Sequence, residues 1–371
     1  MYSADNKKRD PSEKESFLER FNSSFITDMS DIQDPVPFVT VNGSTFASLG
    51  DISFISGAPK AGKSSVTGFI LATALMKDKP RDLDSLGIIS NYQGNRPIIY
   101  IDTEQHPAHT RKRLKVVLKM AGIERQDPER LKVMNWRVFP QKLKYENLIH
   151  ALATFKDACL WVIDGITDFV TSANNEETGN ELIGFLMQKA SENNACIILL
   201  IHENPQNGKM RGHIGSEAER KCGGAISIKK DREKDLHFIE PKYLRDAEDF
   251  TPVVFRYDKT AGRMVSVDAH TSQMALQEQK EKSKGSELKQ LYAKCMGTDK
   301  QLSRAEFRKR IEDHYDPHKE KLPNARETYA NRIVKELEKA FFIRVNGSGK
   351  NQTVEPFAQL EGLLMQNDRL F

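Results

Sequence analysis

One stretch of the chain, residues 57–65, constrains the fold more than any other feature. It reads Gly57-Ala58-Pro59-Lys60-Ala61-Gly62-Lys63-Ser64-Ser65 and matches the pattern G-x-x-x-x-G-K-[ST]. An apolar run at residues 52–56 precedes it, and apolar residues at helical spacing follow it from Val66 to Leu75. The sequence therefore predicts a strand, a phosphate-binding loop and a helix, in that order.

The fixed positions of this loop have distinct chemical roles. Gly57 and Gly62 allow a tight turn, so that successive backbone N–H groups point at phosphate oxygens. Lys63 is expected to reach the β- and γ-phosphates, and the Ser64 hydroxyl to ligate Mg²⁺. The helix that follows directs its positive end at the same phosphates. We therefore expect residues 57–65 to bind a nucleoside triphosphate.

Composition limits the class of protein. The chain has 371 residues, which suggests two or three domains, and its 38% hydrophobic and 29% charged residues are typical of a soluble, rather polar protein. No apolar run approaches the length of a membrane span, and the N-terminus lacks the apolar core of a secretory signal, so we expect a cytoplasmic location without membrane contact. The four cysteines form no C-x-x-C pair, which favours buried free thiols over disulfides or a zinc site.

Apolar strands alternate with helical segments through the middle of the chain. Strands are predicted near residues 97–104, 131–134, 159–164 and 196–201, and helices near residues 107–121, 145–155 and 176–192. This order predicts an α/β domain at residues 36–268 with a mainly parallel sheet covered on both faces. Four short strands, near residues 224–229, 236–240, 253–257 and 263–267, predict antiparallel hairpins at one edge. Residues 1–35 are interpreted as an N-terminal arm that either docks on a neighbouring subunit or is a disordered tail.

The C-terminal part has a different pattern. Residues 269–286 are rich in Gln, Lys, Glu and Ser and are interpreted as a linker. Three helices and a two-stranded hairpin then predict a winged-helix-like DNA-binding domain at residues 287–371. Its third helix carries polar and basic residues suited to phosphates and base edges: Asn324, Arg326, Thr328, Tyr329, Asn331 and Arg332. The alternative is a helical tail that packs on a partner protein.

Three carboxylates end apolar strands. Asp164 is the candidate for the second magnesium contact, after Ser64. Glu104 is expected to orient and deprotonate the attacking water, on a strand expected to lie next to the phosphate-loop strand. Asp102 competes with Glu104 for this role, and either group could instead cap the following helix. Asp168 is interpreted as a cap or loop residue.

Several basic groups are candidates for contacts with the γ-phosphate or with nucleic acid. His202, at a strand end, could sense the γ-phosphate. Lys242 and Arg245 follow a predicted strand and could act on a nucleotide bound to a neighbouring subunit. Residues 206–224 resemble a mobile loop that tracks a nucleic-acid backbone through Lys209, Arg211, Arg220 and Lys221. His106 and His109 have a metal-compatible spacing but no third ligand nearby, so they are interpreted as solvated residues at a helix entry.

The order of these motifs resembles the RecA-like ATPases over about residues 36–268. The phosphate loop, the Ile101-Asp102-Thr103-Glu104 strand end, Val162-Ile163-Asp164 and Ile201-His202 look most like the RepA-type replicative helicases of plasmids and mobile elements and their RecA, DnaB and KaiC relatives. The resemblance implies ATP with Mg²⁺, Glu104 as catalytic glutamate, Asp164 as Walker B aspartate and His202 as sensor. The segment from Lys242 to Arg245 is similar to a Lys-x-Arg element that acts on the neighbour's γ-phosphate, although it is one residue longer, and Arg220 is a rival for that role.

These features lead to two functional hypotheses. The first is an ATP-hydrolysing DNA motor, a ring-forming helicase such as a hexamer, that moves on single-stranded DNA during replication or mobilisation of a plasmid or transposon. The second is an ATP-switched regulator whose winged helix reads duplex DNA. A recombination mediator that coats strands without unwinding them is a further alternative. Stimulation of the ATPase by single strands would distinguish the first hypothesis from the second.

Overall fold

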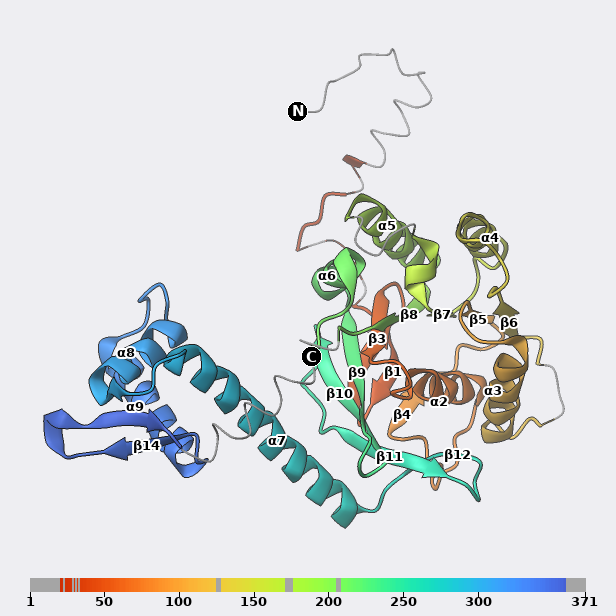
Figure 1. Ribbon diagram of the computed structural model, residues 1–371. Coiled ribbons are helices and arrows are strands. Elements are labelled where there is room, and N and C mark those ends of the chain that lie inside the picture. The colour runs from red at the N-terminus through yellow and green to blue at the C-terminus, as the bar shows by residue number, and fades with distance from the viewer. Residues whose placement is uncertain are drawn as a thin grey trace. The chain divides into compact units, whose positions relative to one another are not determined.

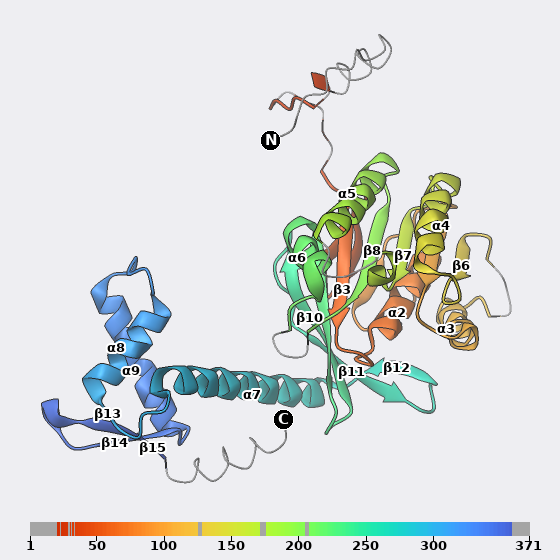
Figure 2. The same ribbon diagram turned by 45° about the horizontal axis from the view of Figure 1, so that its top comes forward.

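The computed structural model describes residues 21–357, except residues 23, 29, 31, 33, 125–127, 171–175 and 205–207. The chain divides into two compact units, Met1–Val265 and Ser266–Phe371. Figure 1 shows the elements of both units, and Figure 2 gives a second view. None of the helices in the described ranges combines the length and apolar character needed to cross a bilayer.

The first unit is built on a nine-stranded sheet in the order β12-β11-β10-β9-β3-β8-β7-β5-β6. The strands are β3 Ile52–Gly57, β5 Ile98–Asp102, β6 Leu131–Asn135, β7 Leu160–Asp164, β8 Cys196–His202, β9 Gly224–Asp231, β10 Leu236–Leu244, β11 Val253–Asp258 and β12 Arg263–Ser266. The pairs from β9 through β3 to β6 are parallel, whereas β10 pairs antiparallel with both β9 and β11. The predicted α/β class with a mainly parallel sheet is therefore confirmed.

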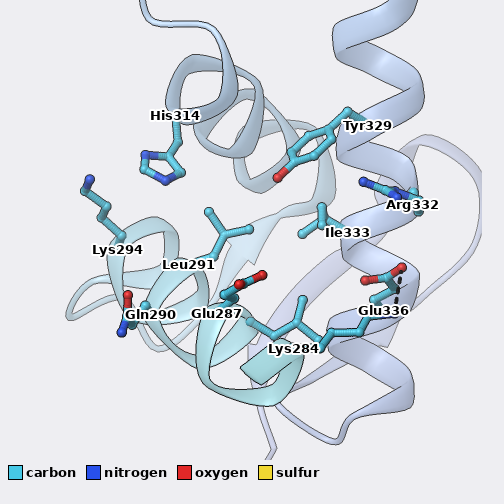
Figure 3. A pocket seen from close by; sticks show the side chains of 11 residues that line it. Lys284, Glu287, Gln290, Leu291, Lys294, His314, Tyr329, Arg332, Ile333 and Glu336 are labelled. Carbon is cyan, nitrogen blue, oxygen red and sulfur yellow. Dashed lines mark ion pairs between the residues drawn. The ribbon is translucent and has the colours of Figure 1, made fainter. Parts of the chain in front are cut away.

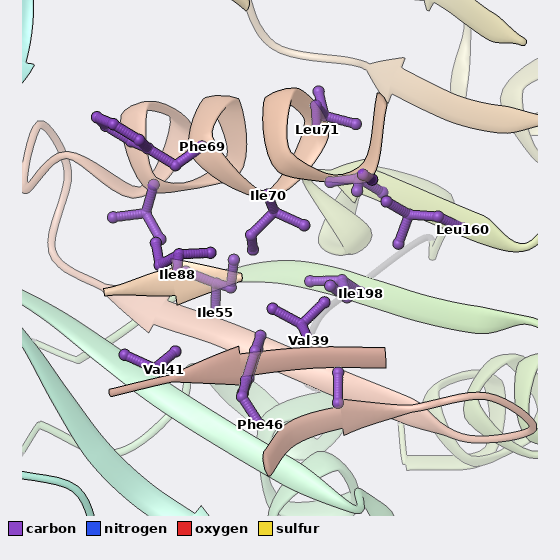
Figure 4. Close-up of a cluster of buried hydrophobic side chains, with 14 of the residues drawn as sticks. Val39, Val41, Phe46, Ile55, Phe69, Ile70, Leu71, Ile88, Leu160 and Ile198 are labelled. Atoms are coloured by element: carbon purple, nitrogen blue, oxygen red, sulfur yellow. The ribbon is translucent and has the colours of Figure 1, made fainter. Parts of the chain in front are cut away.

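Helices cover both faces of this sheet because successive side chains of each buried strand point to opposite faces. Ile55 and Ile198 pack under α2 Lys63–Leu75, as Figure 4 shows, and α3 Pro107–Met120 covers the same face. A small sheet of β1 Pro37–Val41, β2 Ser44–Ser48 and β4 Ile88–Ser90 completes this layer. Phe54 and Ile197 point to the other face, which is covered by α4 Gln141–Thr154, η1 Ile166–Phe169, α5 Glu176–Glu192 and α6 Gly212–Lys221.

Three expectations about this unit are wrong. The strand before Glu104, β5, is not next to β3, since β8 and β7 lie between them; spatial order follows the crossover connections and not the order along the chain. Residues 212–221 form α6 instead of belonging to a mobile loop, because Ile214 and Ala218 are apolar four residues apart and pack on the sheet. Lys242 does not follow a strand, because β10 continues to Leu244 past a pairing irregularity near Pro241.

The described part of the second unit contains three helices and a small antiparallel sheet. The helices are α7 Ala269–Met296, α8 Arg304–Tyr315 and α9 Pro323–Lys339; the strands are β13 Leu302–Ser303, β14 Ile343–Asn346 and β15 Thr353–Pro356, and the turn η2 Gly349–Asn351 lies between the last two. The sheet order is β13-β15-β14, and Phe307, Ile311 and Leu337 are among the side chains of one apolar core.

The predicted linker at residues 269–286 is part of the long helix α7. Residues 269–284 contain no Gly or Pro, and Gln, Lys, Glu and Ala are good helix formers. The Asp268 side chain accepts a hydrogen bond from the Thr271 N–H at 2.9 Å and caps the first turn. A polar composition indicated flexibility, but local helix propensity and this cap produce a helix.

Candidate nucleotide-binding site

The phosphate loop connects β3 to the first turn of α2, as the motif predicts. Gly57 ends β3, and a Cβ there would collide with the carbonyl oxygen of Ile228 on the adjacent strand β9. Gly62 precedes α2 in a left-handed conformation, with φ of 110°. Ala58, Pro59 and Lys60 are exposed at the tip of the loop. Glycine is therefore required at both motif positions, in one case by a close approach and in the other by the backbone conformation.

A chain of polar contacts joins Lys63, His202 and Glu104. The Lys63 ammonium donates to the carbonyl oxygens of Gly57 and Ala58 at 2.7 and 3.1 Å, and its Nζ lies 3.1 Å from His202 Nδ1. An ammonium can only donate, so His202 Nδ1 accepts and its proton lies on Nε2, which is 3.4 Å from Glu104 Oε1. His202 thus bridges the phosphate-loop lysine and the candidate water-activating carboxylate.

The charged side chains in this series of contacts shift one another's pKa values. Burial lowers the pKa of Lys63, while Asp164 and Glu104 oppose that shift. The hydrogen bond from His202 lowers the pKa of Glu104 and favours its carboxylate form. A deprotonated Glu104 is the form that a general base requires. Gly165 makes room for it, because a Cβ at that position would lie 2.6 Å from Glu104 Oε1.

Asp164 ends β7 and lies almost fully buried beside Ser64. The Ser64 hydroxyl donates to Asp164 Oδ2 at 2.8 Å, and the Tyr100 hydroxyl lies 3.4 Å from the same oxygen. Arg113 of α3 donates to the Tyr100 oxygen at 2.8 Å, and its Nη1 is 4.0 Å from Asp164 Oδ2. Burial raises the pKa of Asp164 to about 6 and Glu104 adds to this shift, while the Ser64 hydrogen bond and Arg113 oppose it.

The donor set at this point suits Mg²⁺. A hydroxyl and a buried carboxylate meet at the phosphate loop, and magnesium prefers such oxygen ligands together with nucleotide phosphates. Ser64 and Asp164 therefore fit a magnesium-nucleotide complex. No group of three or more His, Cys, Asp or Glu residues in the described ranges forms a separate metal site.

Asp102, the rival of Glu104, has a structural role in this arrangement. Its carboxylate is fully buried and accepts hydrogen bonds from the backbone N–H groups of Glu104 and Gln105 at 3.2 and 2.9 Å. It also accepts a hydrogen bond from the Thr110 hydroxyl at 2.7 Å. These bonds hold the loop that presents Glu104, so the structure separates two carboxylates that the sequence left in competition. Asp168 pairs with Lys144 at 2.7 Å.

Two adjoining hollows surround the phosphate loop. One, of about 380 Å³, is lined by the loop, Glu104, Asp164 and His202. The other, of about 230 Å³, lies between α3 and the β11–β12 connection. Both are lined by Ser65, Gln105 and Tyr257, and Tyr257 is 47% exposed. The two hollows therefore adjoin one another, and apolar side chains such as Phe69 and Val117 form part of the second one.

The basic residues expected to act on a neighbouring subunit have different environments. Lys242 donates to Glu203 Oε1 at 3.1 Å and to the Gly208 carbonyl at 2.7 Å, so its charge is neutralised within the chain. Arg220 pairs with Glu217 on α6. Arg245 is exposed. Its backbone N–H donates a hydrogen bond to the Gly223 carbonyl oxygen, at the end of the sheet where β3 starts. Of the three candidates, Arg245 alone has no hydrogen bond or ion pair from its side chain among the described residues.

Two residues near the site were missed by sequence reasoning. His237 of β10 is buried beneath the phosphate loop, and its Nδ1 donates to the Ala61 carbonyl at 2.7 Å. Burial lowers the pKa of His237, which favours its neutral form. Glu203 accepts hydrogen bonds from Ser56 at 2.6 Å and Ser227 at 2.9 Å as well as from Lys242. Neither residue lies in a recognisable motif, although Glu203 directly follows the candidate sensor His202.

His106 and His109 are exposed at the entry of α3, where His106 Nδ1 accepts a hydrogen bond from the Ala108 N–H at 3.2 Å. His106 therefore caps the helix, in agreement with its interpretation as an entry residue. The four cysteines are buried free thiols, as predicted.

The predicted DNA-facing side chains of α9 do not all point to solvent. Arg326 turns toward the buried Asp316, with its Nε at 3.7 Å, and Tyr329 stacks on Tyr315 with ring centroids 3.8 Å apart. Asn324, Thr328 and Arg332 are exposed. A hollow of about 550 Å³ lies beside this helix, between α7, α8 and α9. Figure 3 shows that its walls carry both signs of charge, including Lys284, Lys294, Glu287 and Glu336.

Comparison with known families identifies the nucleotide-binding part. A family model described as an AAA domain matches residues 18–208, just over half of the chain and entirely within the first unit. The matched range contains the phosphate loop, Glu104, Asp164 and His202. No curated protein matches the sequence. The match and the mainly parallel sheet fit a RecA-like P-loop core.

Proposed function

The chain belongs to the AAA domain family, a class of P-loop ATPases, and we propose that it works as an ATP-driven DNA motor of the RepA-like helicase type. The observation that carries this proposal is the connection between the nucleotide site and a basic loop. His202 contacts Lys63 and Glu104, and the next residue, Glu203, is bound to Lys242, which in turn binds the Gly208 carbonyl. Lys209 and Arg211 follow directly in this loop. A change at the γ-phosphate therefore has a short path to cations suited to a nucleic-acid backbone.

In this proposal each group of the site has a defined task. The phosphate loop and Lys63 bind the triphosphate, and the base lies in the adjoining hollow beside Tyr257. Magnesium, when bound at Ser64 and Asp164, neutralises charge that develops on the phosphates. Glu104 accepts a proton from the attacking water, and the His202 Nε2–H orients its carboxylate. After loss of the γ-phosphate, Lys63 again donates to the loop carbonyls. His202, which is hydrogen-bonded to Lys63, changes its position with it.

Arg245 motivates an assembly of several copies. The register of β9 with β3 pairs Gly224 with Ser53, whereas the phosphate loop starts at the other end of β3, after Gly57. Arg245 is hydrogen-bonded to Gly223, next to the residue that pairs with the start of β3. It therefore lies at the opposite end of the parallel strands from its own nucleotide site. An exposed arginine in that position is able to act only on a nucleotide of another copy. We therefore propose a homo-oligomer in which Arg245 is the trans-acting cation, while Lys242 has an internal role.

The test is the steady-state ATPase rate of the protein alone, with single-stranded DNA and with duplex DNA. We expect strong stimulation by single strands that is lost in Lys63→Ala and in Glu104→Gln. A rate indifferent to single strands would contradict the motor. Mixing Lys63→Ala with Arg245→Ala tests the assembly, because mixed interfaces pair an intact nucleotide site with an intact arginine and should regain activity. Two variants that stay inactive after mixing, in an assembly that exchanges subunits, would exclude a shared site.

The second unit favours one alternative function, an ATP-switched regulator that binds duplex DNA. Its three described helices and its hairpin support the winged-helix interpretation, and the exposed side of α9 carries Asn324, Thr328, Arg332 and Lys335. This alternative predicts slow ATP turnover that single strands do not change. It also predicts binding to a particular duplex sequence, which selection from a pool of random duplexes would reveal.

A further inference from the structure

A groove of about 430 Å³ lies along α3, next to the proposed base hollow. Three lysines of α3 line it, Lys112, Lys115 and Lys119, and Val116 and Met120 of the same helix are apolar parts of its wall. Lys112, Val116 and Met120 also line the base hollow, so the two spaces adjoin one another. The groove therefore begins where a bound mononucleotide would end.

The charge of this groove is unbalanced. No acidic residue lines it, and the three lysine side chains make no hydrogen bond or ion pair with the part of the chain that the structure describes. The fourth cation of its wall, Arg263, is already engaged, because it lies 3.8 Å from Asp84 and donates to backbone carbonyls. Residues 107–120 contain no Asp or Glu at all. The mixed-charge hollow of the second unit lacks this property, since Glu287 and Glu336 line it (Figure 3).

The spacing of the lysines suits a chain of phosphates. Lys112, Lys115 and Lys119 are three and four residues apart, so consecutive ones lie about one helical turn, roughly 5–6 Å, apart along α3. Long flexible ammonium side chains act as point charges and accept phosphates in many orientations. Apolar side chains between them provide a surface for a base, a combination used for single strands without sequence preference. A row of unpaired cations over an apolar surface therefore matches a single strand better than a small anion.

We propose that the groove along α3 binds a short run of single-stranded nucleic acid, with phosphates on the three lysines and a base over Val116 and Met120. This inference rests on the proposed DNA motor and adds a binding surface separate from the loop at residues 203–211. The surface is close to the chemistry, because α3 also carries Arg113, whose guanidinium contacts Tyr100 and approaches Asp164. A strand on the outer side of α3 would therefore bind the same helix that forms a wall of the nucleotide site.

The experiment compares two double variants of the full chain. Lys115→Gln/Lys119→Gln removes two groove cations that do not line the base hollow, and Lys132→Gln/Lys156→Gln removes two exposed lysines elsewhere on the same unit. Fluorescence anisotropy of a labelled oligothymidylate, measured at several salt concentrations, gives the slope of log K against log salt. We expect the groove variant to lower the magnitude of this slope by about 1.4, or about 0.7 for each lost phosphate contact. The control variant should keep the slope of the unaltered protein.

A second readout locates the strand directly. An oligothymidylate that carries 5-iododeoxyuridine is photocrosslinked to the unaltered protein, and mass spectrometry is expected to find the crosslink within residues 112–120. An unchanged slope in the groove variant, together with crosslinks only at other segments, overturns the inference and leaves the motor intact. Failure of the unaltered protein to bind any oligothymidylate refutes the motor itself. Equal thermal unfolding midpoints of the two double variants verify that both are folded.

Discussion

The two sides of α3 show two ways in which this protein uses charge. On the inner side, Arg113 contacts Tyr100 and approaches Asp164, within a site where Lys63, His202 and Glu104 also contact one another. On the outer side, Lys115 and Lys119 have no hydrogen bond or ion pair among the described residues. In a network of buried, hydrogen-bonded charges, the energy of each group depends on its neighbours. Exposed charges without partners contribute independently, and salt screens them. Substitutions on the inner side should therefore have the larger effects.

The largest effect is expected from Glu104→Gln. An amide cannot accept the proton from water, so kcat should fall by about 10²- to 10⁴-fold while nucleotide binding is retained. Steady-state ATPase assays and binding of a fluorescent nucleotide measure the two properties. Glu146→Gln is the matched control, because it makes the same chemical change at the α4 surface, where Glu146 lies 4.0 Å from Lys142. A Glu104→Gln protein with ordinary turnover would remove Glu104 from the chemistry.

Lys242→Met tests a second cation whose charge is paired within the protein. It leaves the nearly buried Glu203 carboxylate without its ammonium partner, so the free energy of unfolding should fall by about 2 kcal/mol. Denaturant titration measures this loss. The double variant Lys242→Met/Glu203→Gln should recover part of the stability, because it also removes the unpaired charge. If Lys242→Met leaves stability unchanged, the lysine does not neutralise Glu203 in solution.

Asp164→Asn should stabilise the protein in the absence of nucleotide and magnesium. The pKa of Asp164 is raised to about 6 in the folded chain, above its ordinary value of 3.8, so its contribution to stability is complete below pH 3.8 and is lost as the pH rises through 6. The variant should therefore match the unaltered protein near pH 4 and exceed it by about 1–3 kcal/mol above pH 6. Denaturant titrations across this pH range test the sign, and a stability gain that is largest at low pH would contradict it.

The smallest effect is expected on the outer side of α3. Lys115→Glu would place an acid four residues from both Arg111 and Lys119, and should raise the free energy of unfolding by about 0.5 kcal/mol at low salt. The gain should vanish at high salt, where surface charges are screened. Lys115→Gln is the control and should give a smaller gain, because it only removes repulsion. A loss of stability in Lys115→Glu would mean that Lys115 has a partner and that the two sides of α3 do not differ in this way.

The elements that were predicted correctly carry strong local signals. The helix Glu176–Glu192 was predicted with its observed bounds, and the strands that end at Asp164 and His202 were found from uninterrupted apolar runs. The strands β1, β2 and β4 were missed, since each has only three to five residues and none contains a long uninterrupted apolar run. The helix α6 was hidden by its glycines and charged residues. Ile214 and Ala218 are apolar residues four positions apart, but two such residues among glycines and charges are a weak helical signal, and the helix depends on burying them against the sheet.

The sequence by itself determined the phosphate loop, the α/β class and the identity of the residues that end the strands. These are local properties, because loop conformation and strand burial depend on consecutive residues. Only the tertiary structure decided that β8 and β7 separate β5 from β3, that Asp102 supports a loop while Glu104 faces His202, and that Lys242 is neutralised while Arg245 is exposed. Each of these outcomes depends on which side chains, far apart in the sequence, the crossover connections bring within hydrogen-bonding distance. The residue spacing within a single motif does not predict such contacts.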